Sequence, residues 1–261
     1  MLYVCYESYH ACDLAFLFIF CFPCYLFISL TAMFQNMKGQ GKMKKRGKKL
    51  LYLGSIVLTM FVIWTILIMM VDVQPFGQNE TNIGFATVNC WFHNLIGVHM
   101  TIYTITDWLG LVPIFVCFMF GIVGLVQLIK RRSLFKVDGD IIVLGIYYVV
   151  VIVAYLIFEM IPINYRPILI NGFLEVSYPS STTLLVLGVM PTLWEQTNRR
   201  IYNKFLKRII RVFVISFSCF MVAGRVIAGV HWITDIIGGI LLSAGLFMIY
   251  KAAVLLYYKE N

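Results

Sequence analysis

Residues 141–161 read IIVLGIYYVVVIVAYLIFEMI, a run in which Glu159 is the only charged residue. A transmembrane helix needs about 20 predominantly apolar residues to cross the hydrocarbon core of a bilayer, and this run has that length. The run is continuously apolar, whereas the strands of a membrane barrel alternate between apolar and polar residues. The stretch therefore predicts a membrane-spanning α-helix.

Similar runs recur along the whole chain. Of the 261 residues, 61% are hydrophobic and only 13% are charged, which is too few to cover a soluble domain of this length. The predicted spans are Leu14–Phe34, Leu50–Val71, Asp107–Ile129, Ile141–Ile161, Ser180–Trp194, Ile209–Ala223 and Trp232–Tyr258. The fifth and sixth of these are short for a full crossing. The predicted fold class is all-α: a polytopic transmembrane bundle of six core helices, with an extra N-terminal helix if the first run also spans.

The predicted organisation has two parts. Residues 1–49 form an N-terminal apolar segment followed by a basic cytoplasmic linker, and residues 50–261 form the six-helix core. The first run is either a seventh helix with an external N-terminus, or the natural start is Met37 or Met43. The topology after Lys44 is the same in both cases.

The basic residues fix the predicted orientation. Nineteen of the 21 lysines and arginines lie in alternate connections, at 38–49, 130–136, 199–211 and the C-terminal end. Because lysine and arginine are retained on the cytoplasmic side, these connections are predicted to be cytoplasmic. Anionic membrane lipid accounts for the net charge of +9 without nucleic acid as a partner. We expect an integral protein of the plasma membrane.

Arg166 and Arg225 are the two exceptions, and both fall at the non-cytoplasmic face. His231 and Asp235 lie there too, and so does a long outer connection, Asp72–Thr106. Their spacing of four residues predicts that His231 and Asp235 share one face of a helix. A carboxylate bonded to one imidazole nitrogen makes the other nitrogen a better nucleophile. The alternative is a buried pair that only locks helix packing.

The same face offers donors for an anion. Arginine presents a rigid fork of N–H groups suited to phosphate oxygens, although an arginine at a membrane face also snorkels to lipid headgroups. Ser180, Ser181 and Thr182 open a helix, where free backbone N–H groups favour an anion or serve as a plain cap. Fixed donors and a His231 nucleophile together meet the needs of phosphoryl transfer through a phosphohistidine.

These residues resemble the type 2 phosphatidic acid phosphatase superfamily over roughly residues 50–261. The third family motif is a small residue with Arg, then His after five residues and Asp after three more. It stands here as Gly224, Arg225, His231 and Asp235. The Arg-Pro of the first motif is Arg166-Pro167, and the second motif, Pro-Ser-Gly-His, appears as Pro179-Ser180-Ser181-Thr182.

The resemblance implies a role for each matched residue. His231 would be the nucleophile and Asp235 its orienting partner. The phosphoryl group would be bound by Arg166, Ser180, Ser181 and Arg225. The implied activity is that of a phosphatase or phosphotransferase on a lipid phosphate or pyrophosphate at the non-cytoplasmic face. It requires no metal or other cofactor. Its partners would be the phosphorylated lipid and membrane lipids; the oligomeric state is left open.

Two positions depart from the family pattern. The histidine that protonates the leaving group is replaced by Thr182, and the lysine of the first motif is replaced by Glu159. Three accounts stay open. Another outer group supplies the proton: His93, His99, Glu159 or Glu175. The leaving group is a good one, such as the phosphate of a pyrophosphate. Or the protein is a degenerate member that binds phosphorylated lipid headgroups without turnover.

Overall fold

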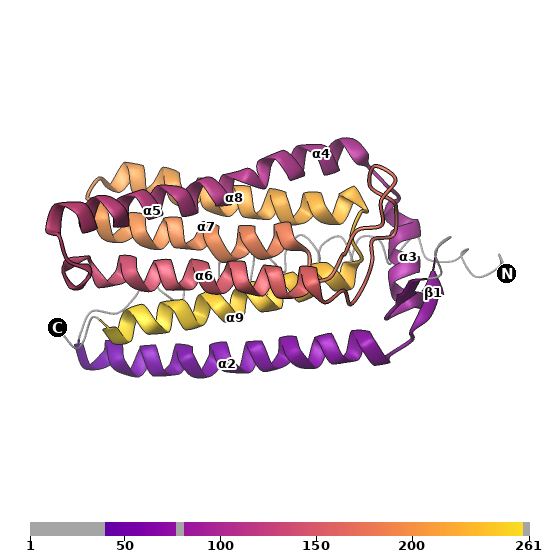
Figure 1. Ribbon diagram of the computed structural model, residues 1–261, viewed down its shortest axis with the longest axis horizontal. Coiled ribbons are helices and arrows are strands. Elements are labelled where there is room, and N and C mark those ends of the chain that lie inside the picture. The colour runs from indigo at the N-terminus through magenta and orange to yellow at the C-terminus, as the bar shows by residue number, and fades with distance from the viewer. Residues whose placement is uncertain (1–39, 77–80, 258–261) are drawn as a thin grey trace.

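A computed structural model describes residues 40–76 and 81–257, and its long helices run side by side along the longest axis (Figure 1). The helices are α2 Gln40–Met70, α3 Ala86–Ile96, α4 Met100–Leu109, α5 Leu111–Arg131, α6 Gly139–Met160, α7 Ser181–Arg200, α8 Lys204–Ala228 and α9 Ile233–Tyr257. A short hairpin of β1 Gln74–Phe76 and β2 Thr81–Ile83 and a 3₁₀ turn at Leu134–Lys136 complete the described elements. The predicted all-α bundle is confirmed. The first predicted span, Leu14–Phe34, lies outside the described residues.

Five helical stretches are long and apolar enough to cross a membrane. They are Lys44–Met70, Met100–Arg131, Gly139–Met160, Lys204–Ala228 and Ile233–Tyr257. These stretches confirm the prediction of an integral membrane protein. The sixth predicted span, Ile209–Ala223, was expected to be short. In the structure it is the middle of α8, which has 25 residues and therefore suffices for a crossing.

Helix α7 is not among these five stretches, and its place in the bundle explains why. It packs against α5, α6, α8 and α9 and lies between α6 and α8 in Figure 1. Because helices rather than lipid surround it, its buried face can carry Thr192 and Gln196. Pro191 removes one backbone donor from α7, and Tyr147 of α6 donates to the nearby carbonyl of Gly188 over 2.8 Å. The predicted short span Ser180–Trp194 is therefore a 20-residue internal helix.

The connection that follows α2 differs from the prediction. The sequence predicts a long outer connection over Asp72–Thr106, but this segment holds the β1–β2 hairpin, all of α3 and the start of α4. Asn89 of α3 explains part of this order. Its amide nitrogen donates to the carbonyl of Gly84 over 2.8 Å and to the hydroxyl of Thr234 over 2.9 Å. These bonds fasten α3 to the first turn of α9.

The two ends of the bundle differ in charge. The basic connections after α5 and α7 and the basic start of α2 lie at one end, where α9 also finishes (Figure 1). Helix α3 and the connections 161–180 and 229–232 lie at the opposite end. The alternation that the basic residues predict along the sequence is thus a separation of charge along the molecule.

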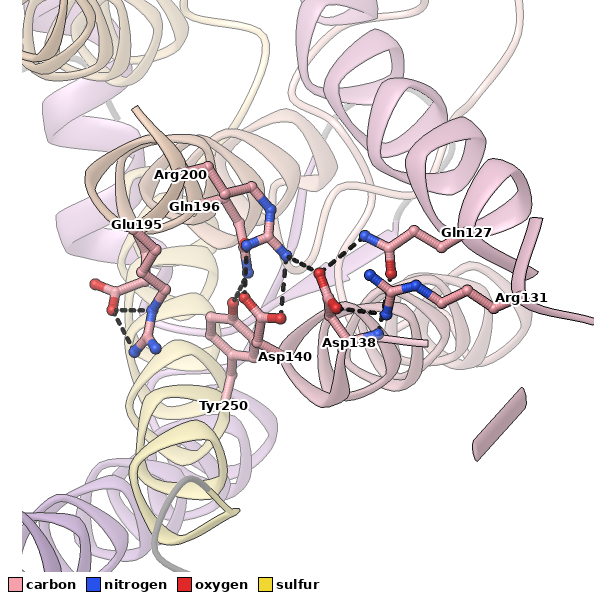
Figure 2. A network of polar contacts seen from close by, with 9 residues as sticks. Gln127, Arg131, Asp138, Asp140, Glu195, Gln196, Arg200 and Tyr250 are labelled. Carbon is pink, nitrogen blue, oxygen red and sulfur yellow. Dashed lines mark hydrogen bonds and ion pairs between the residues drawn. The ribbon is translucent and has the colours of Figure 1, made fainter. Parts of the chain in front are cut away.

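A network of polar side chains joins α5, α6, α7 and α9 at the basic end (Figure 2). Its members are Gln127, Arg131, Asp138, Asp140, Glu195, Gln196, Arg199, Arg200, Tyr250 and Lys251. The fully buried Asp140 receives two hydrogen bonds from Arg200, of 2.9 and 3.0 Å. Arg131 and Asp138 form a more exposed pair at the edge, 2.7 Å apart. The network holds these four helices together at the basic end of the bundle, opposite the connections 161–180 and 229–232.

We expect the buried and the exposed pair to differ in energetic weight. Asp140→Ala leaves the guanidinium of Arg200 without its buried partner, which should cost about 3 kcal/mol of stability. Arg131→Gln breaks the exposed pair and should cost between about 0 and 1 kcal/mol. Thermal unfolding of both variants in one detergent measures the difference. Equal shifts of the two midpoints would show that the network does not hold the bundle as described.

Candidate active site

The connection between α6 and α7 folds back on itself and carries Arg166. The backbone N–H of Arg166 donates to the carbonyl of Glu175 over 3.0 Å, and that of Ser177 donates to the carbonyl of Asn164 over 2.8 Å. These two bonds make a hairpin over residues 164–177. The hairpin holds Arg166 close to Ser177 and directs both toward the turn before α9.

The turn between α8 and α9 carries His231. Gly229 ends α8 with a φ of +66°, and a Cβ there would lie 1.9 Å from the carbonyl oxygen of Gly97. Helix α9 begins only at Ile233, so His231 stands before the helix. The expectation that His231 and Asp235 share one helical face is therefore wrong. The tight turn required at Gly229 lifts the imidazole out of the helical register.

Ser177 links the imidazole to the carboxylate. Its hydroxyl donates to Oδ2 of Asp235 and lies 3.0 Å from Nδ1 of His231. Nδ1 also lies 3.1 Å from the carbonyl oxygen of Ser177, and Asn164 donates to Oδ1 of Asp235 over 3.1 Å. A carbonyl only accepts, and the hydroxyl proton is used on Asp235, so Nδ1 must be the donor. The neutral ring then carries its lone pair on Nε2.

Burial keeps the imidazole neutral. It holds the pKa of His231 well below the usual 6.5, and the nearby positive charges of Arg166 and Arg225 lower this pKa further. Among the described residues, Nε2 of His231 is buried and has no hydrogen-bond partner. A neutral imidazole with a free, fixed Nε2 is the state that a nucleophile requires.

Two arginines from different elements meet at one aromatic ring. The guanidinium carbons of Arg166 and Arg225 lie 5.6 and 5.1 Å from the centroid of the Tyr103 ring. Tyr103 is a residue of α4, and a cation over its face is stabilised by about 0.5–2 kcal/mol. The ring offsets part of the repulsion between the two cations and keeps them together.

Each arginine uses one nitrogen on a protein acceptor. Nη2 of Arg166 lies 3.1 Å from Oε2 of Glu175. Nη2 of Arg225 lies 2.9 Å from Oδ1 of Asp107 and donates to the Thr182 hydroxyl. Nε and Nη1 of both arginines are buried and have no partner among the described residues. Buried charged donors are costly to leave unpaired, so these four nitrogens are candidate donors to an anion.

A cavity of about 290 Å³ opens beside His231. Arg166 and Ser181 line it with His231, and so do Glu159 at the end of α6 and Glu175 of the hairpin. The remaining lining residues are Tyr155, Phe158, Val176, Ser177, Tyr178, Pro179 and Leu184. The structure thus brings together, in one cavity, two of the predicted phosphate-binding residues and the predicted nucleophile.

Two other predicted binding residues do not line this cavity. Ser180 is fully buried, and its hydroxyl accepts a hydrogen bond from Thr183 over 3.0 Å. Arg225 is only 2% exposed and lies near Arg166 and His231 without contributing to the cavity wall. Among the described residues, no group of three or more His, Cys, Asp or Glu side chains is placed to hold a metal ion.

The candidate proton donors fall in different places. Glu159 and Glu175 line the main cavity. His93 lines a second cavity of about 10 Å³ with His231, and burial lowers the pKa of His93. His99 is exposed, with Nε2 lying 3.1 Å from the carbonyl oxygen of Ile96, and it lines neither of these cavities. The hydroxyl of Thr182 accepts a hydrogen bond from Arg225, and a threonine hydroxyl has no proton acidic enough to give to a leaving group.

Sequence reasoning missed three residues of the site. Ser177 and Asn164 hold Asp235, and Tyr103 holds the two arginines. Ser177 and Asn164 each stand near a motif, two residues before Pro179 and Arg166 respectively. No spacing in the sequence indicates that Asn164 pairs with Ser177 across the hairpin, or that Tyr103, which lies on α4, approaches the two arginines.

Comparison with known proteins supports the motif reading. A family model described as the PAP2 superfamily matches residues 142–258. No curated protein and no solved structure matches the chain. The matched segment contains Arg166, Ser177, Arg225, His231 and Asp235, whereas α3 and Tyr103 precede it. The superfamily indicates a phosphatase-type function.

The lowered pKa of His231 predicts how stability depends on pH. Below about pH 6.5 this ring is protonated in the unfolded chain but not in the folded protein. The unfolded state therefore binds more protons, and the free energy of unfolding decreases as the pH is lowered. His231→Gln removes this contribution. The thermal midpoint should therefore fall less steeply between neutral and acidic pH in the variant than in the wild type. Parallel curves for the two proteins would show that His231 is not held neutral by the fold.

Proposed function

We propose that the protein is a membrane phosphatase or phosphotransferase that acts on a lipid phosphate or pyrophosphate, with His231 as nucleophile. The observation that carries this proposal is the group of five buried nitrogens without partners: Nε2 of His231, and Nε and Nη1 of both Arg166 and Arg225. A phosphoryl group in the cavity meets the donors of Arg166, lies near the positive charge of Arg225 and presents its phosphorus to the lone pair on Nε2.

The proposed reaction has two steps. Nε2 attacks phosphorus, an N–P bond forms, and the bond to the leaving oxygen breaks with its electron pair. The ring becomes positive, and Asp235 stabilises this charge through the hydroxyl of Ser177. Water or another acceptor hydroxyl then attacks phosphorus, and its proton passes to the carboxylate that protonated the leaving group. The N–P bond breaks with its electron pair returning to Nε2, which restores the neutral ring. Arg166 and Arg225 meet the charge on the phosphoryl oxygens in both steps.

The side chains of this cavity favour one source for the leaving-group proton. Thr182 cannot supply it, and His99 lies away from the cavity. Glu159 and Glu175 line the same cavity as His231, which favours a carboxyl group as donor. A pyrophosphate substrate needs less help from an acid because its leaving phosphate is a weaker base.

A second candidate function is binding of phosphorylated headgroups without turnover. The observation in its favour is that Thr182 is engaged by Arg225 where the family has its acid. The cavity is also lined by two carboxylates and only one arginine, which weakens the binding of a phosphate and therefore also disfavours its turnover.

The proposed location follows from the charged ends of the bundle. With the basic connections in the cytoplasm, the cavity opens at the non-cytoplasmic face, which we propose to be that of the plasma membrane. Phe158 and Leu184 give the cavity an apolar part, and it lies at the end of a bundle whose sides face lipid. A substrate with an apolar chain in the outer leaflet fits this position.

Two substitutions test the nucleophile and its link to Asp235. His231→Ala should abolish phosphate release from lipid phosphates by the purified protein. Ser177→Ala should lower the rate by ~10²-fold or more, toward the ~10⁴-fold that a wrong tautomer costs in a catalytic triad. Ser177→Thr keeps the hydroxyl and should retain more activity than Ser177→Ala. Full activity in His231→Ala would exclude the mechanism.

A third substitution tests the missing acid. Thr182→His places an imidazole where the family has one, and general acid catalysis contributes ~10²–10⁴-fold where it operates. If the wild type depends on a good leaving group, the rate on alkyl monoesters should rise more than the rate on pyrophosphates. Thr182→Asn is the matched control, because it changes size and polarity without adding an acid. An equal effect of both substitutions on monoesters would show that position 182 does not serve the leaving group.

A further inference from the structure

The carboxylate of Glu159 has no hydrogen-bond or ion-pair partner in the described part of the chain. It is exposed at the end of α6, it lines the main cavity, and no ion pair or hydrogen bond engages it. Glu175 enters the same cavity from the hairpin, 42% exposed, and is held by its ion pair with Arg166. The mouth of the cavity therefore carries two carboxylates from different elements, one of them free.

The charge of the lining opposes a simple phosphate ester. Arg166 is the one cation among the residues that line the cavity, Glu159 and Glu175 are anions, and His231 is neutral. A phosphate monoester brings a further charge of about −1.5 to −2. The deep donors of the two arginines attract that phosphate, but the free carboxylate of Glu159 repels any ligand that is negative throughout.

We propose that the cavity binds a zwitterionic substrate, a lipid phosphate that carries an ammonium group close to its phosphate. The phosphate lies against His231 and the free donors of Arg166, and the ammonium lies against Glu159. The buried, unpartnered Nε2 of His231 in the same cavity marks the phosphate end independently of the acidic residues. This inference rests on the proposed function and adds the chemical class of its substrate.

The ammonium site explains the charge reversal at position 159. A lysine there would extend the positive surface toward the phosphate, whereas Glu159 places a negative charge where the second group of the headgroup lies. The competing role for Glu159 is that of general acid. An acid affects the turnover of every substrate, while an ammonium site affects only the preference for the amine. The two roles are therefore separable by a matched pair of substrates.

The test uses two octadecyl phosphates that differ only in an amino group or a hydroxyl group on the second carbon. We expect the purified full chain in mixed micelles to prefer the amine in kcat/KM by about tenfold. Glu159→Gln should bring the ratio close to one, and Glu159→Lys should reverse it. Asp72→Asn is the matched control, because it removes a carboxylate at the same end of the bundle but outside this cavity, and it should keep the wild-type ratio.

Binding separates this inference from the proposed function. The Kd of each probe, measured by calorimetry with His231→Ala, should show the same preference without any turnover. If the wild type releases no phosphate but the Kd values still favour the amine, the proposed reaction is wrong and the ammonium site stands. Equal Kd values for the two probes would overturn the ammonium site whatever the activity. An equal loss of kcat on both probes in Glu159→Gln, with the ratio unchanged, would make Glu159 the acid and overturn it too. The ammonium site would also be overturned if the preference for the amine disappeared on addition of Mg²⁺ and returned with a chelator, because the carboxylate would then bind the metal ion.

Discussion

The buried carboxylate of Asp235 imposes the constraint on which the site depends. Its side chain is 0% exposed, and a carboxylate in such surroundings is stable only if its oxygens accept hydrogen bonds. It receives them from the hydroxyl of Ser177, the amide of Asn164 and the backbone N–H of Trp232. These donors belong to both arms of one hairpin and to the turn before α9. Satisfying one carboxylate therefore brings Arg166, on the same hairpin, close to His231.

Hydropathy predicts most of the fold because it reports contact with lipid. The runs that became α2, α5, α6, α8 and α9 face the membrane on one side and must be apolar over a full crossing. Helix α7 is surrounded by other helices, so its polar residues are satisfied inside the protein and its hydropathy understates its length. The outer connection was mispredicted for a related reason. Helix α3 is held by the side chain of Asn89, and no window average of hydropathy registers a single amide.

The sequence identified the residues whose chemistry is distinctive. His231, Arg166 and Arg225 stand out because such side chains are costly at a membrane face, and the family motif then relates them to each other. Ser177 does not stand out, because a serine hydroxyl is common in loops and acquires its role only when the chain closes over 54 residues to reach Nδ1 of His231. The spacing of His231 and Asp235 misled for a local reason. Periodicity assumes a helix, and the left-handed Gly229 starts a turn instead.

The depth of the charges gives the cavity a direction. Arg225 is 2% exposed and the side chain of Arg166 10%, whereas the side chain of Glu175 is 42% exposed and Glu159 is exposed at the mouth. Positive charge thus lies deep and negative charge lies at the opening, and the two produce a field along the cavity. On our proposal, such a field would orient a dipolar headgroup before any close contact forms, with its negative end inward. The same arrangement slows a ligand that is negative throughout, because the ligand must pass the carboxylates to reach the arginines. On our proposal, Glu159 in place of the motif lysine changes which ligands reach His231, while His231 keeps its hydrogen bonds to Ser177.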